Sequence, residues 1–316
     1  MEEIINHLRR EFPERPLPDI VYRFFDENGL NTLVDGTLKL TPYLDFNDPF
    51  ETSPALPDFS KISIEEIRGF FMAKDGFARR IFQENNSEGE YKKLVDQFVH
   101  SRAKSFPQHF KEIKEAAILH FTESDGLSCF SEFDDKHLKS PEAILHWSHY
   151  AKNHTGIAIG FKVEHPILNA AANQGCFDRV EYFHTRPVCS LKDFEDFSTT
   201  NIIKVLRRWS RQKSGAWKHE KEWRLVVQLN SKDVLIRSQG ERTLFLYKLW
   251  DNSQTPEQIK KDAECIQRVI IGAKASNDLR LSVHRALSRP HLRHVKIFEA
   301  KLNDYEYTMD IIPINE

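Results

Sequence analysis

The stretch from Asp19 to Tyr43, DIVYRFFDENGLNTLVDGTLKLTPY, decides the fold that we expect for this chain. Its first part, DIVYRFF, is rich in β-branched and aromatic residues and predicts a strand. ENGLNTLVDGT predicts a short helix closed by Gly36, because glycine commonly ends helices in the left-handed conformation. LKLTPY predicts a second strand. The stretch therefore predicts strand, helix and strand in close succession.

The segment 60–120 differs in kind, because its apolar residues recur at helical spacing with charges on the opposite faces. We interpret it as a helical insertion between strands. Beyond it, strand signals occur at 126–132, 155–163, 178–183, 219–229, 267–273, 294–302 and 307–314. Helix signals occur within 1–16 and at 140–154, 200–215, 255–266 and 276–287. Short strands separated by helices of variable length predict a single α+β domain, 1–316, with a mixed sheet.

Composition places the chain among globular proteins without a strong charge. It has 316 residues, 40% hydrophobic and 29% charged, and a net charge of -2. Such a charge gives no general attraction to nucleic acid or membrane. We expect no membrane span and no signal peptide, and four cysteines without a CxxC pair indicate reduced thiols in a cytoplasmic protein. The GxGxxG and GxxxxGK[ST] phosphate-binding motifs are missing from the sequence, which leaves a Rossmann site or P-loop unsupported.

Two glutamates open the strand predicted at 219–229. Glu220 and Glu222 lie two positions apart, so on one strand they would share a face, with Arg224 next on it and Trp217 and Trp223 nearby. The pair is either a charged strand edge in solvent or two carboxylates on the wall of a cleft. In a cleft they could stabilise developing positive charge and orient an acceptor hydroxyl or amine.

Arg23 lies in the otherwise apolar first strand and therefore needs an anionic partner. That partner is either a structural carboxylate or a phosphate. Ser128 and Ser131 similarly interrupt the apolar strand 126–132, so they are candidates to share a cleft with Arg23.

The histidines of HWSHYAKNHTGIAIGF resemble metal ligands only in part. His146 and His149 lie one helical turn apart, and His154 falls at the expected end of the helix. A nearby carboxylate or cysteine ligand is missing from the stretch, so we expect no metal site. Trp147 and Tyr150 are expected to pack.

Two further segments carry unusual polar residues. DFNDPFE, 45–51, forces a turn, and we expect Phe46 and Phe50 to anchor this structural corner to the core. The helix 200–215 has one basic face, formed by Lys204, Arg207, Arg208 and Arg211. Lys213 and Lys218 extend the positive charge toward Glu220. Such a face is usually only solvated. Because it lies directly before Glu220, an anionic substrate or nucleic acid stays an alternative partner for it.

The motifs YRF, FNDPFE, SCFS, HWSHYAKNHTGIAIGF and WKHEKEWR together resemble a large bacterial family known only as a domain of unknown function. The resemblance runs from about Val21 to Pro313 and includes the late pattern RVIIGAK, VKIFEAKL and YTMDIIPI. This family implies no activity.

More distantly, the order of arginine, serine and E-x-E strands is similar to the arginine–serine–glutamate class of ADP-ribosyltransferases. That resemblance implies a split mixed or antiparallel sheet and NAD as co-substrate. It implies that Glu222 stabilises the oxocarbenium-like ribose and that Glu220 orients or deprotonates the acceptor. It also implies that Arg23 holds the NAD diphosphate or a ribose, and that Ser128 or Ser131 supports Glu222. Cofactor contacts are further expected from Tyr22, and Tyr43, Phe46 and Trp223 are candidates to stack on nicotinamide.

We therefore expect an NAD-dependent ADP-ribosyltransferase that modifies an intracellular nucleic acid or protein. By analogy it would act as a bacterial toxin or phage-defence effector and be restrained by an antitoxin. The first alternative is a non-enzymatic binding module in which Arg23, Glu220 and Glu222 form a buried ion network. The second is a metal-dependent nuclease that uses the histidines with Asp48 or Glu51.

Overall fold

The computed structural model describes residues 18–73, 86–134, 136–168, 176–196, 198–240 and 242–314. The chain packs as two compact units. The first comprises Met1–Pro42, Asp125–Arg179 and Lys218–Glu316, and the second Tyr43–Ser124 and Val180–Trp217. The helix expected within 1–16 lies outside the described residues. The expectation of a single catalytic domain stays a prediction.

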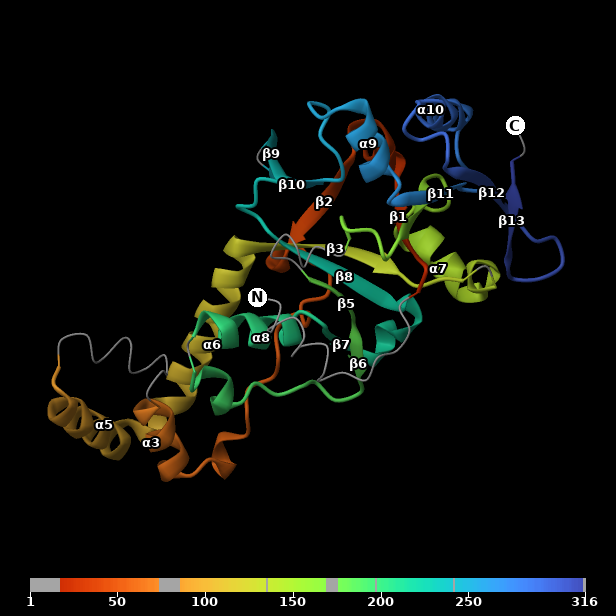
Figure 1. Cartoon of the computed structure of the whole chain (residues 1–316). Coiled ribbons are helices and arrows are strands. Elements are labelled where there is room, and N and C mark those ends of the chain that lie inside the picture. The colour runs from red at the N-terminus through yellow and green to blue at the C-terminus, as the bar shows by residue number, and fades with distance from the viewer. Residues whose placement is uncertain are drawn as a thin grey trace. The chain divides into compact units, whose positions relative to one another are not determined.

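An eleven-stranded mixed sheet forms the first unit (Figure 1). Its main path runs β13-β12-β11-β4-β1-β3-β2-β10-β9, while β8 pairs with both β3 and β5. Strands β11 and β12 are parallel, and the other described pairs of this sheet are antiparallel. The strands are β1 Ile20–Phe25, β2 Thr37–Pro42, β3 Asp125–Ser131, β4 Ile157–Lys162, β5 Cys176–Arg179, β8 Glu222–Gln228, β9 Val234–Gln239, β10 Arg242–Lys248, β11 Ile266–Ile271, β12 Lys296–Leu302 and β13 Met309–Pro313. The expected α+β class with a mixed sheet is confirmed.

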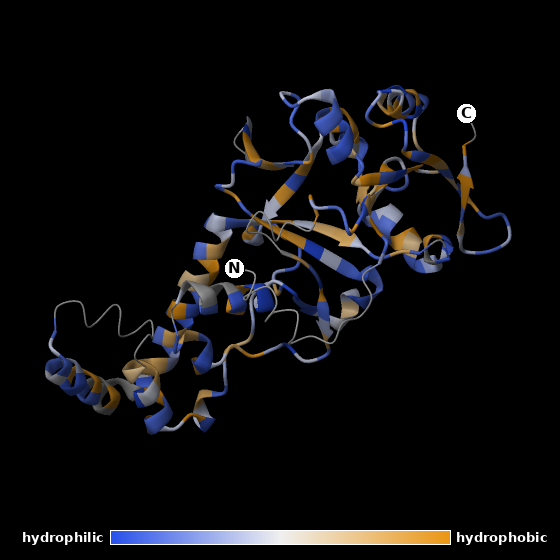
Figure 2. Cartoon of the chain, in the orientation of Figure 1, coloured by the Kyte–Doolittle hydropathy of each residue, from blue (hydrophilic) through white to orange (hydrophobic). Residues whose placement is uncertain are grey.

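Helices cover both faces of this sheet, because its central strands bury both sets of alternating side chains. The first unit contains helices α2 Leu30–Asp35, α7 Pro141–His149, α9 Pro256–Ala263 and α10 Asn277–Leu287, and the 3₁₀ turns η1 Glu27–Gly29 and η5 His137–Lys139. Helices α2, α9 and α10 share one hydrophobic cluster with Val21, Ile159 and Leu225. Helix α7 shares a second cluster with Tyr22 and Phe24. Figure 1 shows α10 and α7 on opposite sides of β11, and Figure 2 shows mostly hydrophobic residues along the strands.

Strands β1 and β2 share one edge of β3 and leave a split between them. Tyr22 of β1 pairs with Ser131 at the end of β3, whereas β2 pairs only with Gly126 and Leu127 at its start. The opposite edge of β3 pairs with β8 along its whole length. The split therefore faces residues 128–130 of β3.

The HWSHYAKNHTGIAIGF motif builds a tight turn between α7 and β4. The helix ends at His149, five residues earlier than expected, because Lys152, Asn153 and His154 take left-handed backbone angles, with φ of 48°, 56° and 69°. A Cβ added to Gly156 would lie 1.8 Å from the Phe25 carbonyl oxygen. The motif therefore holds α7 against β1 through a backbone contact that a side chain would prevent.

The second unit is mainly helical. It contains α3 Ile64–Met72, α5 Glu88–Arg102, α6 Phe106–Ser124 and α8 Thr199–Trp209, the parallel strands β6 Glu181–Phe183 and β7 Gln212–Ser214, and the 3₁₀ turns η2 Tyr43–Asp45, η3 Phe59–Lys61, η4 Ala103–Ser105 and η7 Leu191–Phe194. Phe70, Phe106 and Phe110 are buried at its centre. Helix α8 ends at Trp209 instead of continuing to Gly215, because the chain turns there into β7.

Neither unit contains a described helix that is long and apolar enough to cross a membrane.

Candidate functional site

Arg23 occupies the split between β1 and β2. Its Nη1 donates a hydrogen bond to the carbonyl oxygen of Lys39 at 3.0 Å and another to the hydroxyl of Ser128. The guanidinium also lies over the ring of Phe25, 5.1 Å from its centroid. Arg23 forms no ion pair with a carboxylate of any residue that the structure describes. The side chain thus connects the two strands of the split through neutral groups only.

Burial affects the charge of Arg23. Desolvation lowers its pKa to about 10, and the nearby Cys129 opposes this shift. The guanidinium therefore remains protonated at neutral pH but is poorly compensated. An anion that entered the split would gain from this charge.

The two candidate serines fall on opposite faces of the sheet. Directly paired residues of a ladder share a face, and successive residues of a strand alternate between faces. Tyr22, Ser131 and Glu222 are paired in one row across β1, β3 and β8. Arg23 and Ser128 therefore point to the other face. The structure brings Arg23 together with Ser128, and Glu222 together with Ser131, but it does not bring these two pairs together.

Glu222 forms a buried ion pair on the α7 side of the sheet. Nε and Nη2 of Arg224 donate to its two carboxylate oxygens at 2.7 and 3.2 Å. The side chains of Glu222 and Arg224 are 4% and 0% exposed. A two-pronged contact of this kind compensates both charges, so the pair has the features of a structural ion pair.

Glu220 is not on the same strand as Glu222, which corrects the expected strand 219–229. It ends the 3₁₀ turn η8, Gly215–Glu220, and strand β8 begins at Glu222. Lys221 between them has a left-handed φ of 45°, which breaks the alternation on which the expectation rested. Glu220 is buried, and its carboxylate accepts a hydrogen bond from the hydroxyl of Tyr150. Tyr150, expected only to pack, is therefore a polar partner of Glu220.

His146 belongs to the same buried region. Its ring packs edge-on against Phe133 at 4.7 Å, and Nδ1 lies 3.2 Å from the carbonyl oxygen of Glu142. Burial lowers the pKa of His146 to about 4, so the ring is neutral at neutral pH. His154 stacks on Trp147, with ring planes 11° apart. His149, by contrast, is exposed.

A metal centre has no support in the residues that the structure describes, since none of their His, Cys, Asp and Glu side chains form a group of three with suitable placement. Glu51, a ligand of the nuclease alternative, pairs instead with Lys213 at 2.8 Å in the second unit. Asp48 accepts a hydrogen bond from the backbone N–H of Phe50 at 2.9 Å. This contact agrees with the expected structural corner.

The aromatic candidates for stacking on nicotinamide are largely engaged. Trp223 stacks on Phe177 at 5.2 Å and has Arg179 over its ring at 5.0 Å. Tyr43 is buried within the second unit against Phe121.

The expectation that Phe50 anchors its turn in the core is wrong, because its side chain is 60% exposed beneath the guanidinium of Arg186. Phe46 of the same turn is half-buried.

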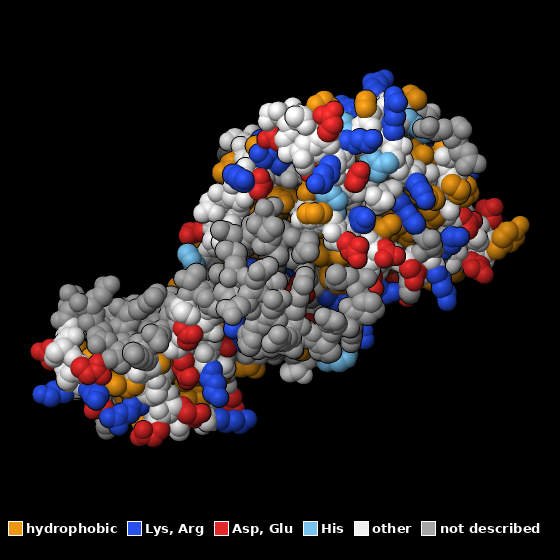
Figure 3. All heavy atoms as spheres, viewed as in Figure 1, with side chains coloured by type: hydrophobic (Ala, Val, Ile, Leu, Met, Phe, Trp, Pro, Cys, Tyr) orange, Lys and Arg blue, Asp and Glu red, His pale blue; other side chains and the backbone are white. Residues whose placement is uncertain are grey.

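The basic face expected on the helix 200–215 is not a continuous exposed surface. Arg208 pairs with Asp193 at 2.6 Å, and Arg211 is buried with Nε donating to the Arg207 carbonyl oxygen. Lys213 is also buried. Away from α8, basic and acidic side chains are interspersed among the described residues on the face that Figure 3 shows. The observation that favoured nucleic acid as acceptor is thereby weakened.

Sequence comparison gives one family match. No curated protein and no solved structure matches the chain. Residues 146–225, which include Tyr150, Glu220 and Glu222, match the family described as "Protein of unknown function (DUF2971)". This part of the chain is therefore similar to a family defined as a domain of unknown function, as its motifs indicated.

Proposed function

We propose that this chain is an NAD-dependent ADP-ribosyltransferase in which the split between β1 and β2 binds the NAD diphosphate. The proposal depends on the contacts of the Arg23 guanidinium. Its Nη1 makes both hydrogen bonds to Ser128 and Lys39, so Nε and Nη2 remain as donors among the described contacts. A planar guanidinium with free donors and no carboxylate partner suits phosphate oxygens.

The strand order supports the same proposal. The strands that carry the arginine, the serines and Glu222 are direct neighbours in the order β1, β3, β8. This is the order that the resemblance to the arginine–serine–glutamate transferases implies. Glu222 lies two strand spacings from β1, about 10 Å, with its side chain on the face opposite to that of Arg23.

In the proposed reaction, the bond between the ribose and nicotinamide breaks and a new bond forms from the same carbon to the acceptor. Neutral nicotinamide leaves, and the proton of the acceptor is released to a base. A carboxylate beside the ribose stabilises the positive charge that develops there, which is the role proposed for Glu222. Glu220, held by Tyr150, would receive the acceptor's proton. The acceptor would be RNA, DNA or protein, in keeping with a toxin or phage-defence effector restrained by an antitoxin.

The placement of Glu222 favours a second candidate function, a non-enzymatic binding module. Glu222 faces away from Arg23 and Ser128, and Arg224 already compensates its charge. In such a module the buried carboxylates would stabilise the fold, and Arg23 would bind an anionic partner without turnover.

The test measures nicotinamide release from NAD, together with transfer of labelled ADP-ribose to RNA and to protein in a cell extract. For the transferase, we expect Arg23→Lys to raise the KM for NAD about tenfold, because lysine lacks the guanidinium fork. We expect Glu220→Gln to lower label transfer at least tenfold, while the amide oxygen still accepts the hydrogen bond from Tyr150.

Arg237→Lys provides a matched control, because Arg237 is an exposed arginine of β9 that pairs with Asp35 at 3.6 Å. It should leave NAD consumption unchanged. Wild-type protein that consumes no NAD with any acceptor would refute the transferase and leave the binding module. Full activity in both Arg23→Lys and Glu220→Gln would refute the assignment of these residues.

A further inference from the structure

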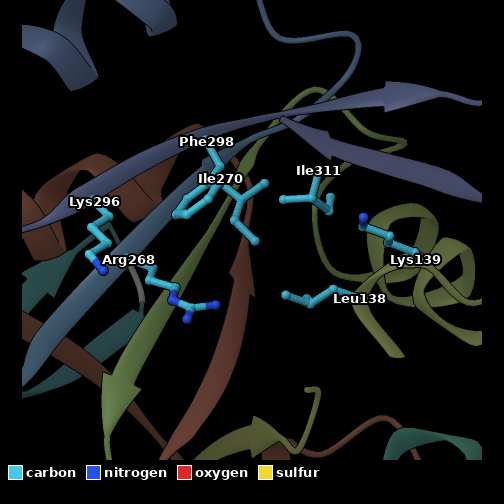
Figure 4. A pocket seen from close by; sticks show the side chains of 7 residues that line it. All are labelled: Leu138, Lys139, Arg268, Ile270, Lys296, Phe298 and Ile311. Atoms are coloured by element: carbon cyan, nitrogen blue, oxygen red, sulfur yellow. The ribbon is translucent and has the colours of Figure 1, made fainter. Parts of the chain in front are cut away.

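A separate pocket lies on the α7 side of the sheet, at its β11–β12–β13 edge. Its volume is about 180 Å³. Three basic side chains line it, Lys139 of η5, Arg268 of β11 and Lys296 of β12. The other lining residues are apolar: Leu138, Ile270, Phe298 and Ile311. In Figure 4, Phe298 and Ile270 lie between two pairs of side chains. Lys296 and Arg268 are on one side of them, and Leu138 and Lys139 are on the other.

Strand register gathers these side chains on one face. Arg268 pairs directly with Lys296, and Ile270 pairs directly with Phe298. Directly paired residues share a face, so the two cations form one row and the two apolar side chains form the next. Ile311 joins the same face because it pairs with Ala300, two residues beyond Phe298 on β12.

Gly160 allows Arg268 to be fixed in position. It lies on β4 between Arg268 and Tyr22, paired with both. A Cβ added there would lie 2.9 Å from the Tyr22 ring and 3.3 Å from the Arg268 Cβ. Without that atom, Nη1 of Arg268 reaches across β4 and donates to the Tyr22 hydroxyl at 3.2 Å. The guanidinium also lies over the ring of Phe298, 5.7 Å from its centroid.

Two cations of this pocket, Lys139 and Lys296, have no counterion in its lining. Like charges that are directly opposite on neighbouring strands destabilise a sheet, and Arg268 faces Lys296 in this way. Lys139 and Lys296 form no ion pair with any residue in the described ranges, and none of the described lining residues is acidic. An anion beside Lys296 and Lys139 would gain from these two charges.

We propose that this pocket binds a small phosphate monoester carried on a flat aromatic group, such as a nucleoside monophosphate. The phosphate would lie between Arg268 and Lys296, with Lys139 at the rim. A phosphate monoester carries roughly two negative charges at neutral pH, which suits a pocket with several cations. The aromatic group would contact the apolar wall formed by Ile270, Phe298 and Ile311. This site is distinct from the split, because Tyr22 and Arg23 point to opposite faces of β1.

Titration calorimetry with AMP, adenosine and inorganic phosphate tests the proposal on the full chain. We expect AMP to bind and each of its halves to bind at least tenfold more weakly, because each engages only one wall of the pocket. Phenyl phosphate should also bind, because the proposal requires an aromatic group without specifying a base.

Variants locate the binding. Lys296→Gln and Arg268→Gln should each weaken AMP about tenfold by removing a charged partner of the phosphate. Phe298→Leu should weaken AMP while leaving inorganic phosphate unchanged. Lys301→Gln is the matched control, because Lys301 is an exposed lysine of the same strand whose side chain points to the other face. It should bind AMP like the wild type.

Three results would overturn the proposal. One is the absence of AMP and phenyl phosphate binding at millimolar concentration in the folded protein. Another is unchanged AMP affinity in both Lys296→Gln and Arg268→Gln. Loss of AMP binding in Arg23→Lys, with the pocket variants unaffected, would place the nucleotide in the split instead. Lys296 is exposed, so its variant remains informative even if Arg268→Gln disturbs the fold. None of these results depends on NAD turnover, so the pocket and the transferase can fail separately.

Discussion

Two charged side chains of the central sheet, Glu222 and Arg23, have opposite surroundings on its two faces. On the α7 side, Glu222 and Arg224 compensate each other's charge. On the other side, Arg23 lies in the split between β1 and β2 with only neutral acceptors. A compensated pair is costly to break, whereas a charge without a counterion is a candidate place for an anionic ligand. The comparison therefore separates a compensated charge from an uncompensated one within one sheet.

The largest effect is expected from Arg224→Ala. It leaves the carboxylate of Glu222 buried without its cation, and breaking such a pair costs about 3–5 kcal/mol. Urea unfolding followed by circular dichroism would measure the lower free energy of unfolding.

The double variant Glu222→Leu with Arg224→Met is its control, because it removes both charges and keeps similar volume. We expect it to recover most of the lost stability. A loss below about 1 kcal/mol in Arg224→Ala would mean that the pair behaves as a solvated one, and the contrast between the two faces would then disappear.

A smaller effect is expected from protonation of His146 on the same α7 side. Its pKa is about 4 in the folded protein, against about 6.5 in an unfolded chain. Between these values the unfolded chain binds the proton and the folded chain does not. The free energy of unfolding should therefore fall as the pH decreases from about 6.5 to about 4, by roughly 3 kcal/mol from this residue.

Unfolding measured at several pH values in the wild type and in His146→Phe checks this expectation. Phenylalanine suits the aromatic surroundings of Phe24 and Phe133 and cannot take up a proton. The exposed His149 on the same helix supplies the control, and His149→Phe should keep the wild-type pH dependence. Identical pH profiles in all three proteins would show that the pKa of His146 is not lowered by burial.

Much of the fold could be predicted from the sequence, because local patterns specify it. The β-branched and aromatic residues of DIVYRFF predicted β1, and Gly36 predicted the end of α2 before β2. The hairpin of β9 and β10 was missed, although Gly240 lies at its turn with a left-handed φ of 62° and the flanking segments VLI and TLFLY are rich in strand-forming residues. This hairpin had a readable signal in the sequence.

The arrangement of the candidate site could not be predicted in the same way. Whether Glu220 and Glu222 share a face depends on the backbone of Lys221, and lysine rarely takes a left-handed angle. The face shared by Ser131 and Glu222 depends on strand register, which is set by tertiary pairing. The pocket around Arg268 depends on Gly160, whose role appears only when β11, β4 and β1 are placed side by side.

The smallest effect, and the sharpest test of the comparison, is expected from Arg23→Met. Desolvation disfavours the charge of Arg23, and its partners are the neutral oxygens of Ser128 and Lys39. Removing the guanidinium ends that desolvation cost while methionine keeps much of the apolar contact with Phe25. We expect the free energy of unfolding to change by less than about 1 kcal/mol, measured in the same urea experiment as Arg224→Ala. If Arg23→Met lowered the free energy of unfolding as much as Arg224→Ala, Arg23 would itself be a structural residue. The proposal that the split binds an anion would then be refuted.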